Sequence, residues 1–567
     1  MLFLLVSVIL FGLLLCGSGC LFGTFLGYSS PRNPWIYFWL GFFIVSTLSM
    51  LGSLFAPINI ISLFVFIAIG TTGLFFFYHE FKQSTAQYDK TETRVFLYIV
   101  LLALIIITCL GAYKIWPGTF DTDLYHAQII RWYNEHGTPP GLGNLHSRLA
   151  FNSSWLSLAA LFDNGIWDNR SAWIMSALAL LGGTLYFLHE LVFSRNNGIR
   201  LYAICILAWL LLKTGSGTAT PSLYYDTPVH ILNAVIVLEA YYLFIGYSRN
   251  LSKKEINEVA NLLMLGVSAF MIKPIGAVSL LFSGMLTLFW FIRNTKQSVS
   301  SWFKIYTPAL CAFTVWVTKN VFLSGYPIYP LPIFPISFDW TMPFNTVESL
   351  YKTVLAWARM PGPDYMQSLE NGFLFWFKLW FIGNIKSKAF LFLVGFPSFL
   401  SIIIWFLVIR YNDIKKTFYF LFWTLFSIAY WFLTAPDIRF GDGFFWVCMG
   451  TALLFATPES PHFAIADFWK NPKIRIVFSY FWGFSVICMI GLTAFSTHRN
   501  FLTIGTIPSR PVKEHTVNAN PPFIVWIPDN DDDRTGNSLL PSSPGVPSNL
   551  EMREPDNLGK GFRPVRQ

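Results

Sequence analysis

Long apolar segments recur along the whole chain, and they constrain its fold more than any other feature of the sequence. A run of roughly 18 or more apolar residues is long enough to cross the hydrocarbon core of a bilayer as an α-helix. The 567 residues are 54% hydrophobic and only 12% charged, about half the charged fraction of a soluble domain. That leaves too little polar surface to cover a water-facing globule, so the sequence predicts an all-α integral membrane protein.

The lengths of the apolar runs predict a polytopic bundle of about fourteen transmembrane helices. The expected spans are 2–26, 35–56, 58–78, 95–114, 170–193, 200–213, 227–246, 259–273, 275–292, 303–323, 389–409, 417–434, 443–456 and 474–495. All seven cysteines fall within these spans. Their position favours small apolar packing residues over a disulfide framework, which would lie in exposed loops.

The distribution of basic residues between the loops predicts the orientation of the bundle. Cytoplasmic loops carry an excess of lysine and arginine. The basic loops here are 79–94 and those near residues 195, 250, 295, 412 and 470. With those loops inside, three polar segments lie outside the membrane: 115–169, 324–388 and 496–567. The net charge of +9 then reflects topology, and we expect no nucleic-acid partner.

This topology divides the chain into a transmembrane module, residues 1–495, and an extracytoplasmic C-terminal tail, residues 496–567. Residues 1–94 form extra N-terminal helices ahead of the first outer loop, 115–169. We expect a multi-pass protein of a cell membrane, of the bacterial cytoplasmic type, with its C-terminus outside. Because the polar, Pro-rich and Gly-rich sequence gathers in the outer segments, the function is expected on that face.

The first outer loop carries two carboxylates, Asp121 and Asp123, immediately before a segment with helical amphipathicity over residues 124–136. Gly137 and the prolines after it end that segment. It is typical of a helix that lies at the membrane interface. Asp123 also suits the N-cap of this helix and Asp121 a turn, so structural and chemical roles stay open for both.

Further polar residues follow in the same loop, before a second interfacial segment over 153–164. Asn144, His146 and Arg148 are the main ones. Polar side chains at the mouth of a membrane bundle need partners. These three are therefore candidates either for a substrate pocket or for groups that satisfy the loop backbone.

Basic residues on the outer side run against the positive-inside rule and so need a reason. An ionisable residue near the outer end of an apolar helix is a functional candidate by default, and an attractive partner is the phosphate of a lipid-linked substrate. The alternative is snorkelling to headgroups or pairing with Asp226 or Asp437. The candidates are Lys114, Arg131, Arg148, Lys273, Lys319, Arg359, Lys386 and Arg439.

The other outer segments carry weaker signals. A helix is expected over 344–359, an aromatic run over 373–381 suits an interfacial belt, and residues 523–527 suit one short strand. The acidic stretch 529–533 is similar to a calcium-binding loop, but Arg534 stands where the turn glycine belongs and Leu540 fills the twelfth position. No metal site and no cofactor are therefore expected.

The segment Asp121-Thr-Asp123-Leu-Tyr125-His126, followed by Arg131-Trp132 and Gly137, resembles the first outer loop of GT-C superfamily glycosyltransferases, in their protein-mannosyltransferase-like branch. There an acidic pair and aromatic residues precede an interfacial helix that ends in glycine. The chain also resembles a family of poorly characterised bacterial polytopic proteins with similar stretches. It departs from the GT-C pattern in having three spans before the helix that leads into the loop, and in an Asp-x-Asp rather than an Asp-Glu pair.

The resemblance implies a GT-C-like bundle that transfers a sugar from a polyprenyl-phosphate donor to a glycan, lipid or protein acceptor, with inversion. Asp121, four residues before Tyr125, matches the catalytic carboxylate, with Asp123 beside it. One base suffices for this chemistry because phosphate is already a good leaving group. The residues expected to bind substrate are Tyr125, His126, Arg131, Asn144, His146, Arg148, Lys273, Lys319, Lys386 and Arg439.

Two other functions compete with this interpretation. A polymerase or ligase of lipid-linked glycans would rely on a catalytic Arg or His in an outer loop, such as Arg148 or His146. A transporter of polysaccharide or lipid would show repeat symmetry and helices broken at the bilayer midplane. The sequence contains no convincing repeat, and Lys273-Pro274 marks a hairpin between two spans.

Overall fold

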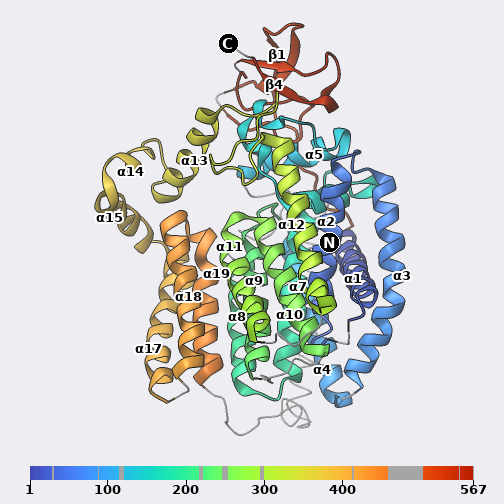
Figure 1. Cartoon of the computed structure of the whole chain (residues 1–567), viewed down its shortest axis with the longest axis vertical. Coiled ribbons are helices and arrows are strands. Elements are labelled where there is room, and N and C mark those ends of the chain that lie inside the picture. The colour runs from blue at the N-terminus through green and yellow to red at the C-terminus, as the bar shows by residue number, and fades with distance from the viewer. Residues whose placement is uncertain are drawn as a thin grey trace.

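Apolar helices form a long bundle in the computed structural model, with the loops and the tail gathered at one end (Figure 1). The structure describes residues 1–28, 31–86, 88–113, 120–215, 221–245, 253–293, 299–411, 414–456, 502–530, 532–547 and 549–565. Within these ranges, twelve helices are long and apolar enough to cross a membrane. The prediction of a helical, multi-pass membrane protein is therefore confirmed.

The twelve membrane-spanning candidates correspond to twelve of the expected spans. They lie in α1 (Leu2–Phe25), α2 (Ile36–Ser53), α3 (Ile60–Thr85), α4 (Lys90–Tyr113), α7 (Ser171–Phe193), α8 (Asn197–Gly215), α9 (Asp226–Ile245), α10 (Lys253–Ile272), α11 (Ala277–Arg293), α17 (Phe396–Tyr411), α18 (Ile414–Thr434) and α19 (Ile438–Ala456). The short turns η5 (Pro274–Gly276), α16 (Lys388–Phe390) and η6 (Leu391–Gly395) lead into α11 and α17.

Two expected spans are not among the twelve. The segment 303–323 does form a helix, α12 (Val299–Ser324), but Lys304, Lys319 and Asn320 lower its hydropathy, so it does not qualify by composition. The segment 474–495 lies outside the described residues.

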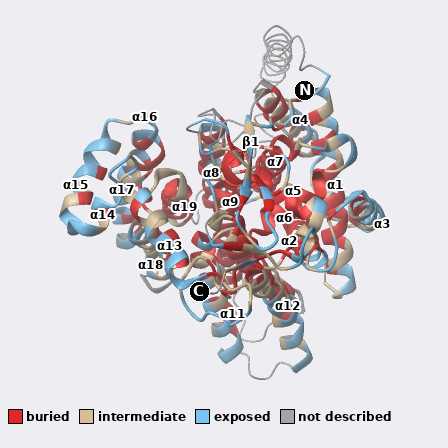
Figure 2. Ribbon diagram, turned by 90° about the horizontal axis from the view of Figure 1, so that it is seen from above, coloured by how far each residue is buried: buried red, intermediate tan, exposed pale blue. Residues whose placement is uncertain are grey.

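Side chains on the outside of the bundle are largely apolar, as a helix surface in contact with lipid requires. Large hydrophobic residues are exposed along the outer helices, among them Phe64 on α3, Phe399 and Phe406 on α17 and Phe418 on α18. Seen from above, the buried residues gather around α1, α5, α6, α7 and α9, whereas α14, α15 and α17 are mostly exposed (Figure 2).

The first outer loop folds into short helices over the end of the bundle. They are η1 (Thr122–His126), α5 (Ala127–His136), η2 (Leu142–Asn144), η3 (Ser147–Ala150), α6 (Ser154–Phe162) and η4 (Gly165–Trp167). The expected stop of the amphipathic helix is confirmed: Gly137 has a φ of 73°, which favours glycine. The interfacial segment expected over 153–164 is α6.

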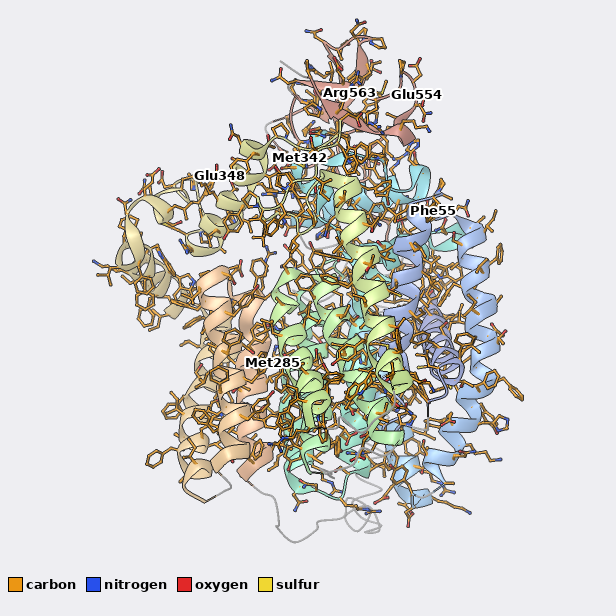
Figure 3. All side chains as sticks on the ribbon, in the orientation of Figure 1. Phe55, Met285, Met342, Glu348, Glu554 and Arg563 are labelled. Atoms are coloured by element: carbon orange, nitrogen blue, oxygen red, sulfur yellow. The ribbon has the colours of Figure 1, made fainter. Side chains whose placement is uncertain are left out.

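The second outer loop contains α13 (Phe344–Arg359), α14 (Gln367–Glu370) and α15 (Gly372–Ile385). The helix expected over 344–359 is confirmed at both ends. In Figure 3, Glu348 on α13 and Glu554 and Arg563 of the tail lie at the same end of the molecule, and Met285 lies along the bundle.

The tail contains more regular structure than the one strand that was expected. It forms two antiparallel pairs, β1 (Val512–Val517) with β2 (Phe523–Pro528) and β3 (Leu550–Met552) with β4 (Phe562–Pro564), and a turn η7 (Leu558–Lys560). The single strand expected over 523–527 is β2. Its partners were missed because β1, β3 and β4 carry exposed or charged residues that weaken the strand pattern.

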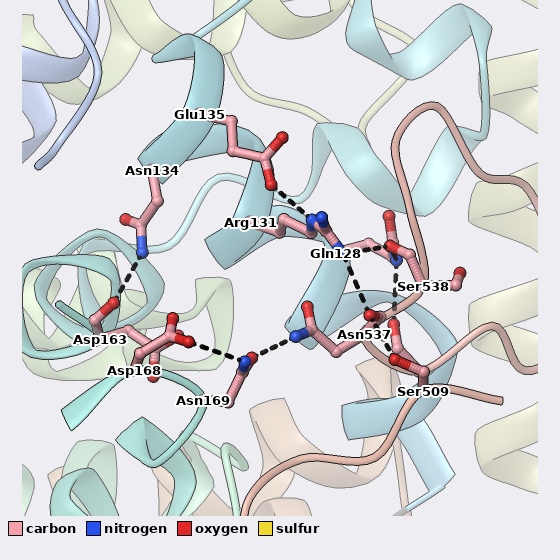
Figure 4. A network of polar contacts seen from close by, with 11 residues as sticks. Gln128, Arg131, Asn134, Glu135, Asp163, Asp168, Asn169, Ser509, Asn537 and Ser538 are labelled. Atoms are coloured by element: carbon pink, nitrogen blue, oxygen red, sulfur yellow. Dashed lines mark hydrogen bonds and ion pairs between the residues drawn. The ribbon is translucent and has the colours of Figure 1, made fainter. Parts of the chain in front are cut away.

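The tail docks on the first outer loop through polar contacts (Figure 4). The amide of Gln128 donates to the carbonyl oxygens of Gly536 and Ser538, both at 3.0 Å. The guanidinium of Arg131 donates to the carbonyl of Ser538 at 2.9 Å. Arg553 pairs with Asp339 at 2.7 Å and so connects the tail to the second outer loop. All three segments expected on one face of the membrane thus meet at one end of the bundle.

Candidate functional site

Asp121 stands at the start of the loop helix η1 and contacts α19. Its Oδ2 lies 3.3 Å from Nη1 of Arg439, the second residue of α19. Arg439 also lies 3.6 Å from the carboxylate of Asp437. Asp437 accepts the backbone N–H of Arg439 at 3.0 Å, as an N-cap residue does. The start of α19 therefore fixes the arginine against the loop carboxylate.

A second cation lies next to this pair. Nζ of Lys273 is 2.5 Å from Oδ1 of Asp226, the first residue of α9, and 3.5 Å from the centroid of the Phe440 ring. The guanidinium of Arg439 lies 4.7 Å from the same ring and 4.5 Å from that of Tyr224. Both cations thus contact the Phe440 ring, and such contacts stabilise positive charge. The alternative prediction that Lys273 pairs with Asp226 is confirmed.

His126 is buried beside these ion pairs. Its ring centroid lies 5.3 Å from that of Tyr225 and 6.2 Å from that of Tyr224. Burial lowers the pKa of His126 to about 3, although the nearby carboxylate of Asp121 acts to raise it. The imidazole is therefore neutral at pH 7. Burial likewise holds the pKa of the preceding residue, Tyr125, well above its usual value.

Asp123 has a different environment from Asp121. It is the second residue of η1, so the N-cap role expected for it is wrong. Its buried carboxylate accepts the Nε–H of Arg510 at 2.9 Å and a second N–H from the same guanidinium. Its backbone carbonyl accepts the N–H of Gly536 at 2.7 Å. Burial raises the pKa of Asp123, an effect that Arg510 opposes. Asp123 anchors the tail.

A cavity of about 560 Å³ lies beside the same loop helix. His146 and Arg148 line it, together with Leu124, which follows Asp121 by one turn. The guanidinium of Arg148 lies 5.9 Å from the centroid of the Tyr125 ring. Asp121 itself is not among the lining residues.

Four of the expected substrate-binding residues have other contacts. Arg131 binds the tail backbone and Glu135, the latter at 2.5 Å. Asn144 donates to the carbonyl of Trp340 at 2.8 Å, so it supports loop backbone. Lys386 is exposed at the end of α15, which lies apart from α5 in both views (Figures 1 and 2).

Lys319 is the fourth. It is fully buried and donates to the hydroxyls of Ser53 and Ser157, at 2.9 and 3.0 Å. Its Nζ also lies 3.5 Å from the centroid of the Tyr133 ring. The lysine therefore joins α12 to α2 and α6 inside the packed end of the bundle, outside the group around Asp121.

Sequence reasoning missed a buried ion pair deeper in the bundle. Nζ of Lys213 on α8 lies 2.5 Å from Oδ2 of Asp442 on α19. The ring of His230 on α9 lies 3.9 Å from the same carboxylate. The sequence did carry a signal for this pair, because Lys213 and Asp442 are charged residues next to or within apolar spans. Such residues are rare and mark functional or paired positions. Arg510 and Tyr224 carried no comparable signal.

No group of three or more His, Cys, Asp or Glu side chains within the described ranges could hold a metal ion. The acidic stretch of the tail has a different use, because Asp532 pairs with Arg534 at 2.7 Å.

Residues 1–446 match the family described as Domain of unknown function (DUF8201). The chain belongs to this family. The matched region contains the first and second outer loops and ends within α19, after Arg439. Asp121, Lys273 and Arg439 therefore all lie in the DUF8201 region, whereas Arg510 and the rest of the tail lie beyond it. No curated protein and no solved structure matches the chain.

Proposed function

We propose that this protein is a membrane glycosyltransferase with a GT-C-like bundle that moves a sugar from a polyprenyl-phosphate donor to an acceptor hydroxyl. The observation that carries the proposal is the contact between Asp121 and Arg439, next to the Lys273–Asp226 pair. A carboxylate able to accept a proton stands beside two cations able to hold a phosphate. Asp121 stands at the start of η1, Lys273 directly before η5, and Arg439 is the second residue of α19.

Asp121 is the general base in this proposal. It takes the proton of the acceptor hydroxyl while the hydroxyl oxygen attacks the anomeric carbon of the donor. The bond between that carbon and the phosphate oxygen breaks, and the electron pair leaves with the phosphate. Attack from the face opposite the phosphate inverts the anomeric configuration. No general acid is needed, because the phosphate leaves as an anion.

Arg439 and Lys273 stabilise the charge that develops on the phosphate. Each is neutralised by carboxylates in this structure, Arg439 by Asp121 and Asp437 and Lys273 by Asp226. A donor phosphate competes with Asp121 for Arg439. Binding of the donor thus frees the Asp121 carboxylate at the moment when it is needed as a base.

The membrane supplies the donor. Nucleotide sugars are absent outside the cytoplasmic membrane, so a transferase on that face depends on lipid-linked sugars. The basic loops favour this orientation, with the site and the C-terminus outside the cell. The apolar helices provide a surface for the polyprenyl tail.

Removal of the protein from its native cell tests the proposal. The expected result is accumulation of one polyprenyl-phosphate sugar, identified by mass spectrometry of the lipid extract. Wild-type protein returns that lipid to its normal level, and an Asp121→Asn variant expressed to the same level does not. Unchanged lipid-linked sugars in the depleted cells contradict the proposal.

One observation favours a second candidate, a polymerase or ligase of lipid-linked glycans. The cavity is lined by His146 and Arg148, and not by Asp121. An enzyme of that kind would lose activity in Arg148→Ala or His146→Gln and keep it in Asp121→Asn. The two candidates therefore make opposite predictions for Asp121→Asn.

A further inference from the structure

The cavity beside the first outer loop has walls from three parts of the chain that are far apart in sequence. Its volume of about 560 Å³ falls in the range of small-molecule sites, about 300–1,000 Å³. The first loop contributes Leu124, His146, Ser147 and Arg148, α13 contributes Asn345, Thr346, Ser349, Leu350 and Thr353, and the tail contributes Asp533 and Pro544.

The lining from α13 is a stripe of hydroxyl and amide groups. Asn345, Ser349 and Thr353 recur at intervals of four residues, so they share one face of the helix. Hydroxyl and amide groups both donate and accept hydrogen bonds. A surface of this kind matches a ligand whose own groups also do both, as the hydroxyls of a carbohydrate do.

The charges of the lining favour an uncharged ligand. Arg148 contributes one positive charge and Asp533 one negative charge. Burial, together with the positive charge of the neighbouring Arg148, lowers the pKa of His146 to about 3, so the imidazole is neutral at pH 7. The formal charges of the lining therefore cancel.

Arg148 has unused hydrogen-bonding capacity at this wall. Its guanidinium lies 5.9 Å from the centroid of the Tyr125 ring, and within the described residues no ion pair joins it to a carboxylate. The side chain is half-buried, so its N–H groups are available to hydroxyl groups of a ligand in the cavity.

We propose that this cavity binds an uncharged carbohydrate, the acceptor of the transfer reaction, with Asp533 of the tail as a hydrogen-bond acceptor for its hydroxyls. The inference rests on the proposed function. Leu124 lines the cavity and follows Asp121 by one helical turn, so the acceptor is held beside the loop segment that carries the base. The Arg510–Asp123 contact keeps the tail wall in place.

Binding measured without any donor tests the cavity separately from catalysis. The full-length protein in lipid nanodiscs is titrated with neutral di- and trisaccharides of gluco, galacto and manno configuration, and with inorganic phosphate, by saturation-transfer NMR. Ser349→Phe fills the cavity, and Asp533→Asn removes the tail charge. The matched controls are Glu348→Phe and Asp529→Asn. Glu348 pairs with Lys352 at the surface of α13 (Figure 3), and Asp529 is an exposed tail residue.

The expected result is binding of at least one neutral oligosaccharide, weakened about tenfold or more by Ser349→Phe and clearly weakened by Asp533→Asn. The two controls bind as wild type does. Failure of the whole panel to bind, or binding unaffected by Ser349→Phe, overturns the carbohydrate cavity even if Asp121 proves catalytic. Normal cavity binding combined with an active Asp121→Asn enzyme supports the cavity and contradicts Asp121 as the base.

Discussion

Asp121 and Asp123 are two residues apart, yet their carboxylates have opposite surroundings. Residues at this spacing on a helix do not face the same side. Asp121 is partly exposed beside Arg439, whereas Asp123 is buried against Arg510 of the tail. A carboxylate that exchanges a proton with a substrate must be reachable, and one that holds a tail must not be displaced. In the proposed mechanism the chemical role therefore belongs to Asp121, whereas Asp123 anchors the tail.

The neutral histidine beside the site predicts how stability depends on pH. The folded pKa of His126, about 3, lies below its ordinary value of 6.5, so the unfolded chain binds more protons between these values. Stability from His126 is then fully present above pH 6.5 and is lost as pH falls toward 3. We expect thermal unfolding in detergent to shift to lower temperature between pH 7 and pH 4.

Replacing His126 tests whether this histidine causes the pH dependence of stability. His126→Asn should reduce the slope of unfolding free energy against pH, by up to about 1.4 kcal/mol per pH unit near the low end, and with it the pH dependence of the unfolding temperature. His146, whose pKa burial also lowers, keeps part of the slope. His79→Asn is the control, because this histidine is exposed on α3. An unchanged slope in His126→Asn contradicts the assignment.

The sequence identified Asp121, Lys273 and Arg439 as candidates but not the way in which they combine. Each was recognisable as an ionisable group near the end of an apolar segment. Their pairing depends on how α9, α10 and α19 pack, and residues about 150 to 300 positions apart carry no local sign of contact. Arg510 was missed for the same reason, because it lies in a polar tail where one arginine resembles any other.

At the scale of elements, α1 and α2 show the closest backbone packing near the N-terminus. A Cβ atom on Gly41 would lie 1.9 Å from the carbonyl oxygen of Leu15, and one on Gly19 would lie 1.9 Å from that of Tyr37. Small residues let transmembrane helices approach so closely. The two helices pack through these glycines, and the loop helices rest on the end of this pair, where Ser53 accepts the N–H of Thr138 at 2.7 Å.

Gly41→Ala should separate α1 from α2, because backbone atoms fill the space that its methyl group needs. We expect a loss of about 1–3 kcal/mol in unfolding free energy, as in other overpacked cores. Gly52→Ala in the same helix is the matched control, since a Cβ there meets nothing within 4 Å. Equal melting temperatures for the two variants in the same detergent would exclude close packing of α1 and α2.

Local sequence patterns predicted most of the helices. They failed for most strands of the tail and for the membrane-spanning character of α12. The stop at Gly137 and the helix α13 followed from turn glycine and amphipathic spacing. Of the four tail strands only β2 was expected, because a two-stranded pair has little buried surface to impose alternation on its partners. The span expected over 303–323 was assigned on run length, and Lys319 and Asn320 make α12 too polar for that criterion.

At the scale of the whole molecule, three segments separated by hundreds of residues converge at one end of the bundle. The first outer loop makes all three contacts. Its Asp121 pairs with Arg439 of α19, and its Ser147 carbonyl accepts a hydrogen bond from Tyr329 of the second outer loop at 2.7 Å. Its Arg131 donates to the backbone of the tail. Run length and loop charge predicted that these segments share a side of the membrane. The contacts between them depend on tertiary packing that the sequence pattern does not encode.

The orientation of this end is open to direct measurement. A reporter fused after Gln567 should be active outside the cytoplasm, and one inserted after Lys254 should be active in the cytoplasm, because the basic loops stay inside. Alkaline phosphatase and green fluorescent protein fusions make complementary readouts. The same compartment for both reporters contradicts the proposed topology.

The most direct test of the account is the transfer activity of purified Asp121→Asn with the donor identified in depleted cells. The exchange keeps the size of the side chain but removes its basicity. We predict that the variant transfers sugar about 10²- to 10⁴-fold more slowly than the wild type. Its unfolding temperature and its binding of polyprenyl phosphate should equal those of the wild type. Asp123→Asn, the control, should lower stability and keep partial activity. An Asp121→Asn enzyme within a few-fold of wild-type rate would contradict the account.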